Sequence, residues 1–353
     1  RRNNGLMKEY IHGGDIYRHP DVLDFSANIN PLGTPPAVVQ AAKDSMEWIC
    51  HYPDACQEKL KQALAAYEQV PVEWLICGNG AAELIFALVQ AVKPKRALVM
   101  APTFAEYAQA LEAVGCEVDR EILKKEDGFT LQRTILEKLQ KEDLQMVFLC
   151  NPNNPTGILI NPKLLLEIVT ICEKRNIYLV VDECFLDFVS EPEVHTLKGE
   201  LEGKQYLFLL KAFTKRYAMA GLRLGYGITS NETLMEKMER QLQPWNVSMP
   251  AQEAGVAALK ETAYVEKARE LIFQEQVFLK DGLKACGYPV LDSQANYVFF
   301  EGEPDLYEKL LEEGVMIRDC SNYPGLWKGC YRIAVKLHNE NEQLLRKIRK
   351  VRR

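Results

Sequence analysis

Short apolar runs of strand length alternate with helix-period segments through the middle of this 353-residue chain. The apolar runs cover residues 74–77, 96–101, 145–150, 177–181 and 206–210. Helical patterns at 81–92, 104–114 and 162–175 follow the first three runs. Continuous apolar strands between amphipathic helices are typical of a parallel sheet that is covered on both faces. The pattern therefore predicts an α/β fold with a mainly parallel central sheet.

The pattern changes after about residue 250. A charged, helix-period stretch covers 250–284, and short strand-like pieces at 297–300, 315–318 and 331–335 precede further helical segments. Because the chain is longer than one ordinary core, we expect two domains. A large domain at 46–265 would be joined through the helix to a small α+β domain at 266–353, and residues 1–45 would pack with the small domain. Ligands of open α/β sheets bind beyond the carboxyl ends of the strands, which predicts where the site lies.

The overall composition narrows the class of protein. The net charge of −6 argues against a nucleic-acid-binding surface, and no apolar run approaches the roughly 20 residues of a membrane span. The ten cysteines form no Cys-x-x-Cys pair and mostly lie in apolar runs, and no signal peptide is recognisable. These features indicate the reducing cytoplasm. The five histidines are scattered, so we expect no metal site.

The segment from Ala212 to Gly227 carries the strongest chemical signal. Lys215 follows an apolar run, and Arg223 comes eight residues later within Gly-Leu-Arg-Leu-Gly. A lysine that forms a Schiff base with an aldehyde cofactor needs a fixed position and a lowered amine pKa. A phosphorylated cofactor also needs a nearby cation and small residues where backbone approaches phosphate. The segment meets these needs, although a basic loop before a Gly-bounded strand is also compatible with it.

Three other segments follow predicted strands. Gly78-Asn-Gly-Ala-Ala-Glu83 opens a helix and presents backbone N–H groups to an anion, or is simply a tight strand-to-helix turn. It lacks the third glycine of the dinucleotide fingerprint. Asn154 lies in a turn-rich string that either supplies an amide to a cofactor hydroxyl or is only a loop. Asp182 ends an apolar strand, where it caps a helix or pairs with a protonated pyridine nitrogen.

In this order, the four segments resemble those of fold-type I enzymes, which depend on pyridoxal 5′-phosphate (PLP). The resemblance covers essentially the whole chain and implies an aspartate aminotransferase-like fold. It implies that Lys215 forms the Schiff base, that Asp182 pairs with the pyridinium nitrogen and that Asn154 bonds to the cofactor 3′-oxygen. It further implies a stacking aromatic at Phe104 and a set of phosphate ligands comprising Gly80, Ala81, Ala82, Thr214 and Arg223.

The resemblance also implies a substrate site and a homodimer. Tyr52, in His-Tyr-Pro-Asp, matches the tyrosine that reaches the cofactor phosphate of the other subunit. Arg332 matches the arginine that grips the substrate α-carboxylate, a job suited to a planar guanidinium. Arg318 and His12 would help bind a phosphate group on the substrate, with Asn30 nearby. The implied partner is a small phosphorylated amino acid.

Within fold type I, the chain is most similar to threonine-phosphate decarboxylases of cobalamin biosynthesis and next to histidinol-phosphate aminotransferases. Phe185, where the aminotransferases generally carry Tyr, favours the decarboxylases. We therefore expect PLP-dependent decarboxylation of L-threonine O-3-phosphate to aminopropanol phosphate. The alternatives are an aminotransferase of the histidinol-phosphate type and, more remotely, a non-catalytic binder of phosphorylated metabolites. The chain departs from its relatives at Ala212, where a Ser often contacts the cofactor phosphate.

Overall fold

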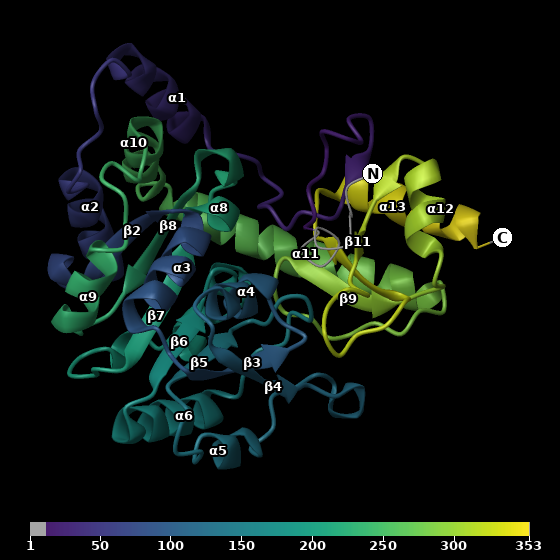
Figure 1. Ribbon diagram of the computed structural model, residues 1–353. Coiled ribbons are helices and arrows are strands. Elements are labelled where there is room, and N and C mark those ends of the chain that lie inside the picture. Colours follow the sequence, from purple (N-terminus) through teal and green to yellow (C-terminus); the bar gives the residue numbers. More distant parts are fainter. Residues whose placement is uncertain (1–11, 353) are drawn as a thin grey trace, which may run out of the picture.

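The computed structural model describes residues 12–352 and is built around a seven-stranded sheet (Figure 1). All neighbouring pairs are parallel except those that involve β8, which is antiparallel to both β2 and β7. The predicted mainly parallel sheet is thus confirmed. In spatial order the strands are β2 (Leu75–Asn79), β8 (Leu224–Ile228), β7 (Leu207–Ala212), β6 (Tyr178–Asp182), β5 (Met146–Cys150), β3 (Arg96–Ala101) and β4 (Glu117–Ile122).

Helices surround the sheet and bury its strands. Every residue of β5, β7 and β8 is buried, as expected for strands covered on both faces. The surrounding helices are α2 (Glu58–Glu68), α3 (Gly80–Val92), α4 (Ala105–Ala113), α5 (Ile135–Lys138), α6 (Pro162–Arg175), α9 (Glu232–Glu239) and α10 (Met249–Ala258).

Two strands of this sheet were not predicted from the hydrophobic pattern. β4 has the sequence Glu-Val-Asp-Arg-Glu-Ile and lies at the sheet edge, where most of its side chains reach solvent. β8 contains Gly225 and Gly227, which weaken a strand signal. Both glycines are needed for packing, because a Cβ on Gly227 would lie 2.1 Å from the Phe208 ring and one on Gly225 would lie 2.4 Å from the Ala81 nitrogen.

A smaller part of the molecule has its own core. Its antiparallel sheet has the order β11 (Arg318–Asp319), β12 (Cys330–Ala334) and β9 (Tyr297–Glu301). Its helices are α11 (Thr262–Ala285), α12 (Leu306–Glu312) and α13 (His338–Val351), and α11 leads to it from the large sheet (Figure 1). The expected continuous helix over 250–284 is two helices, because the backbone leaves helical geometry at Glu261.

The N-terminal segment is divided between the two parts. β1 (Leu23–Asp24) pairs with β10 (Val315–Met316), and Phe25 belongs to the small core. Helix α1 (Pro36–Ser45) instead packs on α10, and its Val38 belongs to the large core. The expectation that all of residues 1–45 pack with the small domain is therefore corrected for α1, since Val38 finds its apolar partners in the large core. Residues 1–11 of that segment lie outside the described part, and the domain boundaries stay a prediction.

Two features are absent from the described residues. No helix between residues 12 and 352 is long and apolar enough to cross a membrane. The same residues contain no group of three or more His, Cys, Asp or Glu side chains that could hold a metal ion.

Candidate active site

Lys215 lies in a cavity of about 270 Å³ at the carboxyl ends of the central strands. Helix α8 (Phe213–Arg216) follows β7 directly and holds the lysine there. Burial lowers the pKa of the amine, and the neighbouring cations Arg332 and Arg223 lower it further, against the opposing effects of Cys184 and Asp182. A lowered amine pKa is what a Schiff-base lysine requires. The amine lies 5.9 Å from the centre of the Phe185 ring.

Asp182 faces the same cavity from the end of β6. Its Oδ2 accepts a hydrogen bond of 2.5 Å from the Tyr107 hydroxyl, and its Oδ1 accepts one of 2.9 Å from the Cys184 backbone N–H. Burial raises the pKa of the carboxyl above its usual value, and these donors and the Lys215 charge offset only part of that effect. Asp182 does not cap the helix that follows it and it lines the cavity, so its pairing with a pyridinium nitrogen stays a prediction.

The turn between β2 and α3 faces Arg223 across a short gap. Gly80 has φ +79°, and a Cβ there would lie 2.4 Å from Nη2 of Arg223. The N-cap residue Asn79 makes no side-chain hydrogen bond to the helix, so the first-turn N–H groups at Ala81 and Ala82 form the positive end of α3. A guanidinium beside a helix N-terminus is a site for an anion. Thr214 lines the same cavity. This donor set fits the phosphate of PLP.

Two arginines enter the cavity from the small domain. Arg318 and Arg332 are Cα partners across β11 and β12, so their side chains leave the same face of the sheet. Both are buried and both line the cavity. Arg332 donates through Nη1 to the Asn154 side-chain oxygen and through Nη2 to the Ser26 carbonyl at 2.8 Å. The structure therefore brings Asn154, a residue of the large domain, together with the predicted carboxylate ligand.

Phe104 and His12 lie where the main cavity meets a second one of about 250 Å³. The Nε2 of His12 is 2.9 Å from Oε1 of Glu106, and the imidazole centroid is 6.4 Å from that of Phe104. Arg318 lines both cavities and donates to the Asn322 side chain at 2.9 Å. The three residues thus share one wall of the site.

Two predicted residues lie elsewhere. Asn30 lines neither of these cavities: its side chain donates to the Arg216 carbonyl at 2.8 Å and its backbone N–H donates to the Lys215 carbonyl at 3.2 Å. It therefore holds the lysine loop from behind instead of facing substrate. Tyr52 is 76% exposed and stacks on Trp245 with ring centroids 4.3 Å apart. Such a surface position is what a residue serving a neighbouring subunit would have.

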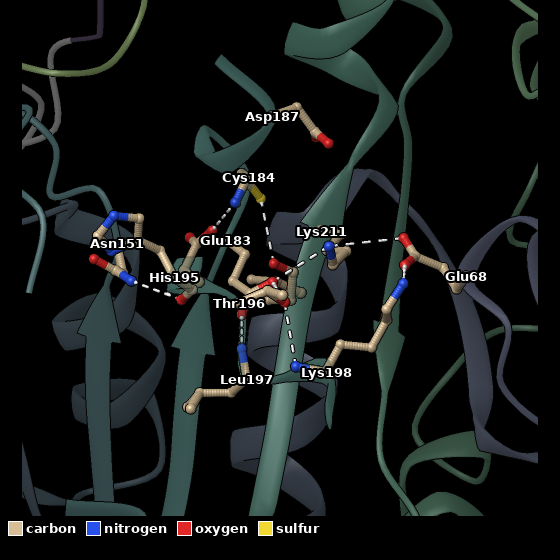
Figure 2. A network of polar contacts seen from close by, with 12 residues as sticks. Glu68, Asn151, Glu183, Cys184, Asp187, His195, Thr196, Leu197, Lys198 and Lys211 are labelled. Atoms are coloured by element: carbon tan, nitrogen blue, oxygen red, sulfur yellow. Dashed lines mark hydrogen bonds and ion pairs between the residues drawn. The ribbon is translucent and has the colours of Figure 1, made fainter. Parts of the chain in front are cut away.

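A polar network around Lys211 was not predicted from the sequence (Figure 2). The amine of Lys211 is 3.2 Å from Glu183 and 3.7 Å from Glu68, and Glu183 also accepts hydrogen bonds from Thr196 and from the backbone of Leu197. The pKa of Lys211 is raised, because the two carboxylates outweigh the effect of burial. A lysine between an apolar run and further apolar residues, Lys211 between Leu210 and Ala212, was the signal that could have revealed this network.

Arg216 extends the network directly behind Lys215. Its side chain is fully buried and lies 3.0 Å from Asp187. It donates to the hydroxyls of Tyr67 and Tyr226, each at 2.9 Å, and Tyr226 in turn donates to Glu68 at 2.5 Å. The residue after the lysine is thus anchored to α2, β8 and the segment that follows β6.

Tyr107 is one of several cavity-lining residues that the sequence interpretation missed. It lines the cavity, and it lies three residues after Phe104 on α4. Residues at that spacing share a helix face, so the predicted position of Phe104 already contained the signal.

Known proteins with the same sequence pattern and fold identify the family. Residues 20–348 match the family described as aminotransferase class I and II. The chain is 41% identical to the threonine-phosphate decarboxylase of Salmonella typhimurium over 96% of both chains. It is 33% identical to a histidinol-phosphate aminotransferase of Anaeromyxobacter over 96% of this chain and 95% of that one.

A solved structure agrees with these sequence relatives. The histidinol-phosphate aminotransferase of Clostridium acetobutylicum superposes with a TM-score of 0.87 at 30% identity, covering 94% of this chain and 99% of that one. The predicted aspartate aminotransferase-like fold of type I is thereby confirmed. This chain belongs to the class I and II aminotransferase family, whose members depend on PLP.

Proposed function

We propose that this chain is a PLP-dependent lyase that decarboxylates L-threonine O-3-phosphate to aminopropanol phosphate, a reaction of cobalamin biosynthesis. The observation that carries the proposal is the pairing of Arg318 with Arg332 on one face of β11 and β12, inside the cavity that contains Lys215. Two buried guanidinium groups suit a substrate with two anionic groups, a carboxylate and a phosphate. The 41% identity to a threonine-phosphate decarboxylase supports the same substrate.

The residues that would hold PLP surround Lys215. The backbone at Gly80, Ala81 and Ala82, with Thr214 and Arg223, would bind its phosphate, and Phe104 would stack on its ring. The Asn154 amide nitrogen would donate to the 3′-oxygen, since the amide oxygen accepts from Arg332. When bound, PLP supplies a protonated pyridine ring that accepts the electron pair of a bond broken at the substrate Cα.

The side chains of the pocket would then select the bond that breaks. Arg332 would bind the α-carboxylate, and Arg318 with His12 would bind the phosphate, so the two ends of the substrate are fixed and its rotation about Cα is restricted. Asp182 would keep the ring nitrogen protonated. After CO2 leaves, Lys215 would donate a proton to Cα as general acid, and burial lowers the pKa of its amine, the direction that makes an amine a better proton donor.

An aminotransferase is the second candidate. It is favoured by the TM-score of 0.87 to a histidinol-phosphate aminotransferase and by the 33% identity to another. The same pocket would serve, with Lys215 removing the Cα proton instead of returning one. Phe185 favours the decarboxylase, because the aminotransferases generally carry at this position a Tyr, whose hydroxyl can bond to the cofactor, and the phenylalanine next to Lys215 has no such group.

We further propose a cytoplasmic homodimer. All ten cysteines are free, which suits a reducing compartment. Exposed large side chains gather near Tyr52 in the sequence, namely Met46, Trp48 and Ile49, and such side chains are typical of an interface. Sedimentation at micromolar concentration tests the dimer, and mixing Tyr52→Phe with Lys215→Ala subunits tests whether Tyr52 acts on its neighbour. Restored PLP binding in the mixture would support it; unchanged binding would contradict it.

The reaction itself is tested with two substrates. The PLP-loaded protein is incubated with L-threonine O-3-phosphate and, separately, with histidinol phosphate plus 2-oxoglutarate, while CO2 and glutamate are measured. CO2 from the first mixture alone supports the decarboxylase. Glutamate from the second without CO2 from the first would replace it with the aminotransferase, and neither product would point to the non-catalytic binder.

A further inference from the structure

Tyr107 is held in one orientation beside Asp182. The side chain is fully buried, and its ring stacks on Phe148 with centroids 4.9 Å apart and an interplanar angle of 14°. The Phe104 ring meets it edge-on at 5.5 Å. With the ring fixed on two sides, the hydroxyl is directed at Oδ2 of Asp182, 2.5 Å away.

The protons around Asp182 determine the direction of this hydrogen bond. Burial, and then the neighbouring Asp182 charge, raise the pKa of Tyr107 well above its usual value, so the phenol keeps its proton and donates. The thiols of Cys150 and Cys184 face the same carboxylate, and burial raises the pKa of both, which leaves them neutral. The other titratable groups facing Asp182 are Lys215, whose charge is opposite, and the neutral Tyr297.

We propose that Tyr107 is a positioning residue that keeps the Asp182 carboxylate ionised and thereby keeps the pyridine nitrogen of PLP protonated. The inference rests on the proposed role of Asp182 and on PLP as cofactor, but not on which substrate is used. A hydrogen bond donated to a carboxylate favours its charged form over its neutral form. Without the Tyr107 hydroxyl, burial favours the neutral carboxyl, and the shared proton moves from the ring nitrogen toward Asp182.

The burial of a tyrosine can also be explained without any role in chemistry, because a buried hydroxyl needs a partner. Asp182 would then only satisfy the hydrogen bond of the Tyr107 hydroxyl, and removing that hydroxyl would leave the protonation of the cofactor ring nitrogen unchanged. The two explanations differ in the state of the ring nitrogen, so that nitrogen is the measurement of choice.

The test uses the full chain loaded with PLP that carries 15N in its ring. The nitrogen NMR signal is recorded for the wild type, Tyr107→Phe and Tyr331→Phe, with thermal melting to establish that each is folded. Tyr331 is the matched control: its side chain is buried and its hydroxyl donates one hydrogen bond, to the Glu303 carbonyl at 2.7 Å. It is absent from the cavity wall.

We expect the Tyr107→Phe signal to move toward the unprotonated form while the Tyr331→Phe signal stays with the wild type. The Kd for PLP should rise roughly ten-fold and kcat should fall roughly ten-fold, the size expected for one hydrogen bond to a charged group. KM should change little. Replacing Tyr107 by 3-fluorotyrosine, a stronger donor of nearly the same volume, should move the signal the other way and serves if the phenylalanine variant does not fold.

An unchanged nitrogen signal in a folded Tyr107→Phe protein would overturn the inference, as would equal shifts in both tyrosine variants. Because no substrate is needed, the proposed decarboxylase can fail while this inference stands. If the wild type gives no signal of bound PLP, the proposed cofactor site and this inference fall together.

Discussion

The cavity around Lys215 and the network behind it are built from the same two chain segments but differ in charge balance. In the first segment, Asp182 faces the cavity and the next residue, Glu183, belongs to the network. In the second, Lys215 faces the cavity and the next residue, Arg216, belongs to the network. In the network, cations and carboxylates are matched one for one: Lys198, Lys211 and Arg216 against Glu68, Glu183 and Asp187. In the cavity, cations are in excess: Lys215, Arg223, Arg318 and Arg332 outnumber Asp182 and Glu106.

The difference shows how one stretch of backbone serves stability and binding at once. Buried charges are tolerated when paired, and the matched network meets that condition by itself. An excess of cations around a cavity favours anions, and a phosphorylated cofactor with a phosphorylated amino acid would supply them. Side chains of neighbouring residues leave the backbone in different directions, so adjacent positions can be assigned to the two tasks.

The largest expected effect concerns the cavity side alone. Lys215→Ala should abolish turnover of L-threonine O-3-phosphate, because no other described side chain of the cavity is an amine able to form the Schiff base. The unfolding free energy should fall little, since the network stays intact. Product formation and urea unfolding are measured on the same preparation; substantial retained turnover would refute the lysine assignment.

On the network side, Arg216→Met should lower the unfolding free energy by about 3–5 kcal/mol, because the fully buried guanidinium is lost together with its ion pair to the part-buried Asp187 and its hydrogen bonds to Tyr67 and Tyr226. Chemical denaturation measures this loss. The control is Arg133→Met, which breaks an exposed pair with Glu167 and should leave stability nearly unchanged. Equal losses in the two variants would mean that burial of the pair adds nothing.

Acid should weaken the network through Glu68. Burial raises the pKa of Glu68, but Lys211 and Arg216 outweigh it and lower the pKa from 4.5 to about 2. The folded pKa is depressed, so this stabilisation is complete above pH 4.5 and is lost as the pH falls toward 2, by about 3 kcal/mol. The unfolding free energy, measured across this pH range, should depend less steeply on pH in Glu68→Gln than in the wild type. Parallel slopes would assign the acid sensitivity to other groups.

The smallest effect concerns the cavity. Ala212→Ser should restore a hydroxyl that relatives often use toward the cofactor phosphate, since Ala212 lines the cavity beside Thr214. We expect PLP to bind tighter by about 1 kcal/mol, the net value of one hydrogen bond. Titration of the apoprotein with PLP measures this, and Ala212→Val is the control that adds bulk without a donor. Weaker binding in both would mean that the position has no room.

The sequence predicted most of what depends on local pattern. The five apolar runs of the large domain became strands, and residues at or just after the ends of four of them, Ala81, Asn154, Asp182 and Lys215, line one cavity. Such features are predictable because a buried parallel strand needs a continuous apolar run, and phosphate-binding turns need small residues. The hydrophobic pattern missed β4 and did not predict β8, which appeared only as the Gly-bounded strand of one interpretation, because an exposed edge strand and a glycine-rich strand lack that apolar signal.

Only the tertiary structure decided which side chains from different elements contact each other. The Asn30 side chain, expected near the substrate, donates to the Arg216 carbonyl. The hydroxyl of Tyr107, on α4, donates to one carboxylate oxygen of Asp182. The network of Glu68, Lys211 and Arg216 joins α2, β7 and α8, which no sequence period relates. Local spacing determines which face a side chain leaves from, whereas its partner depends on which elements the sheet order makes neighbours. Sequence therefore determined the chemistry of the candidate site, and packing determined which groups support it.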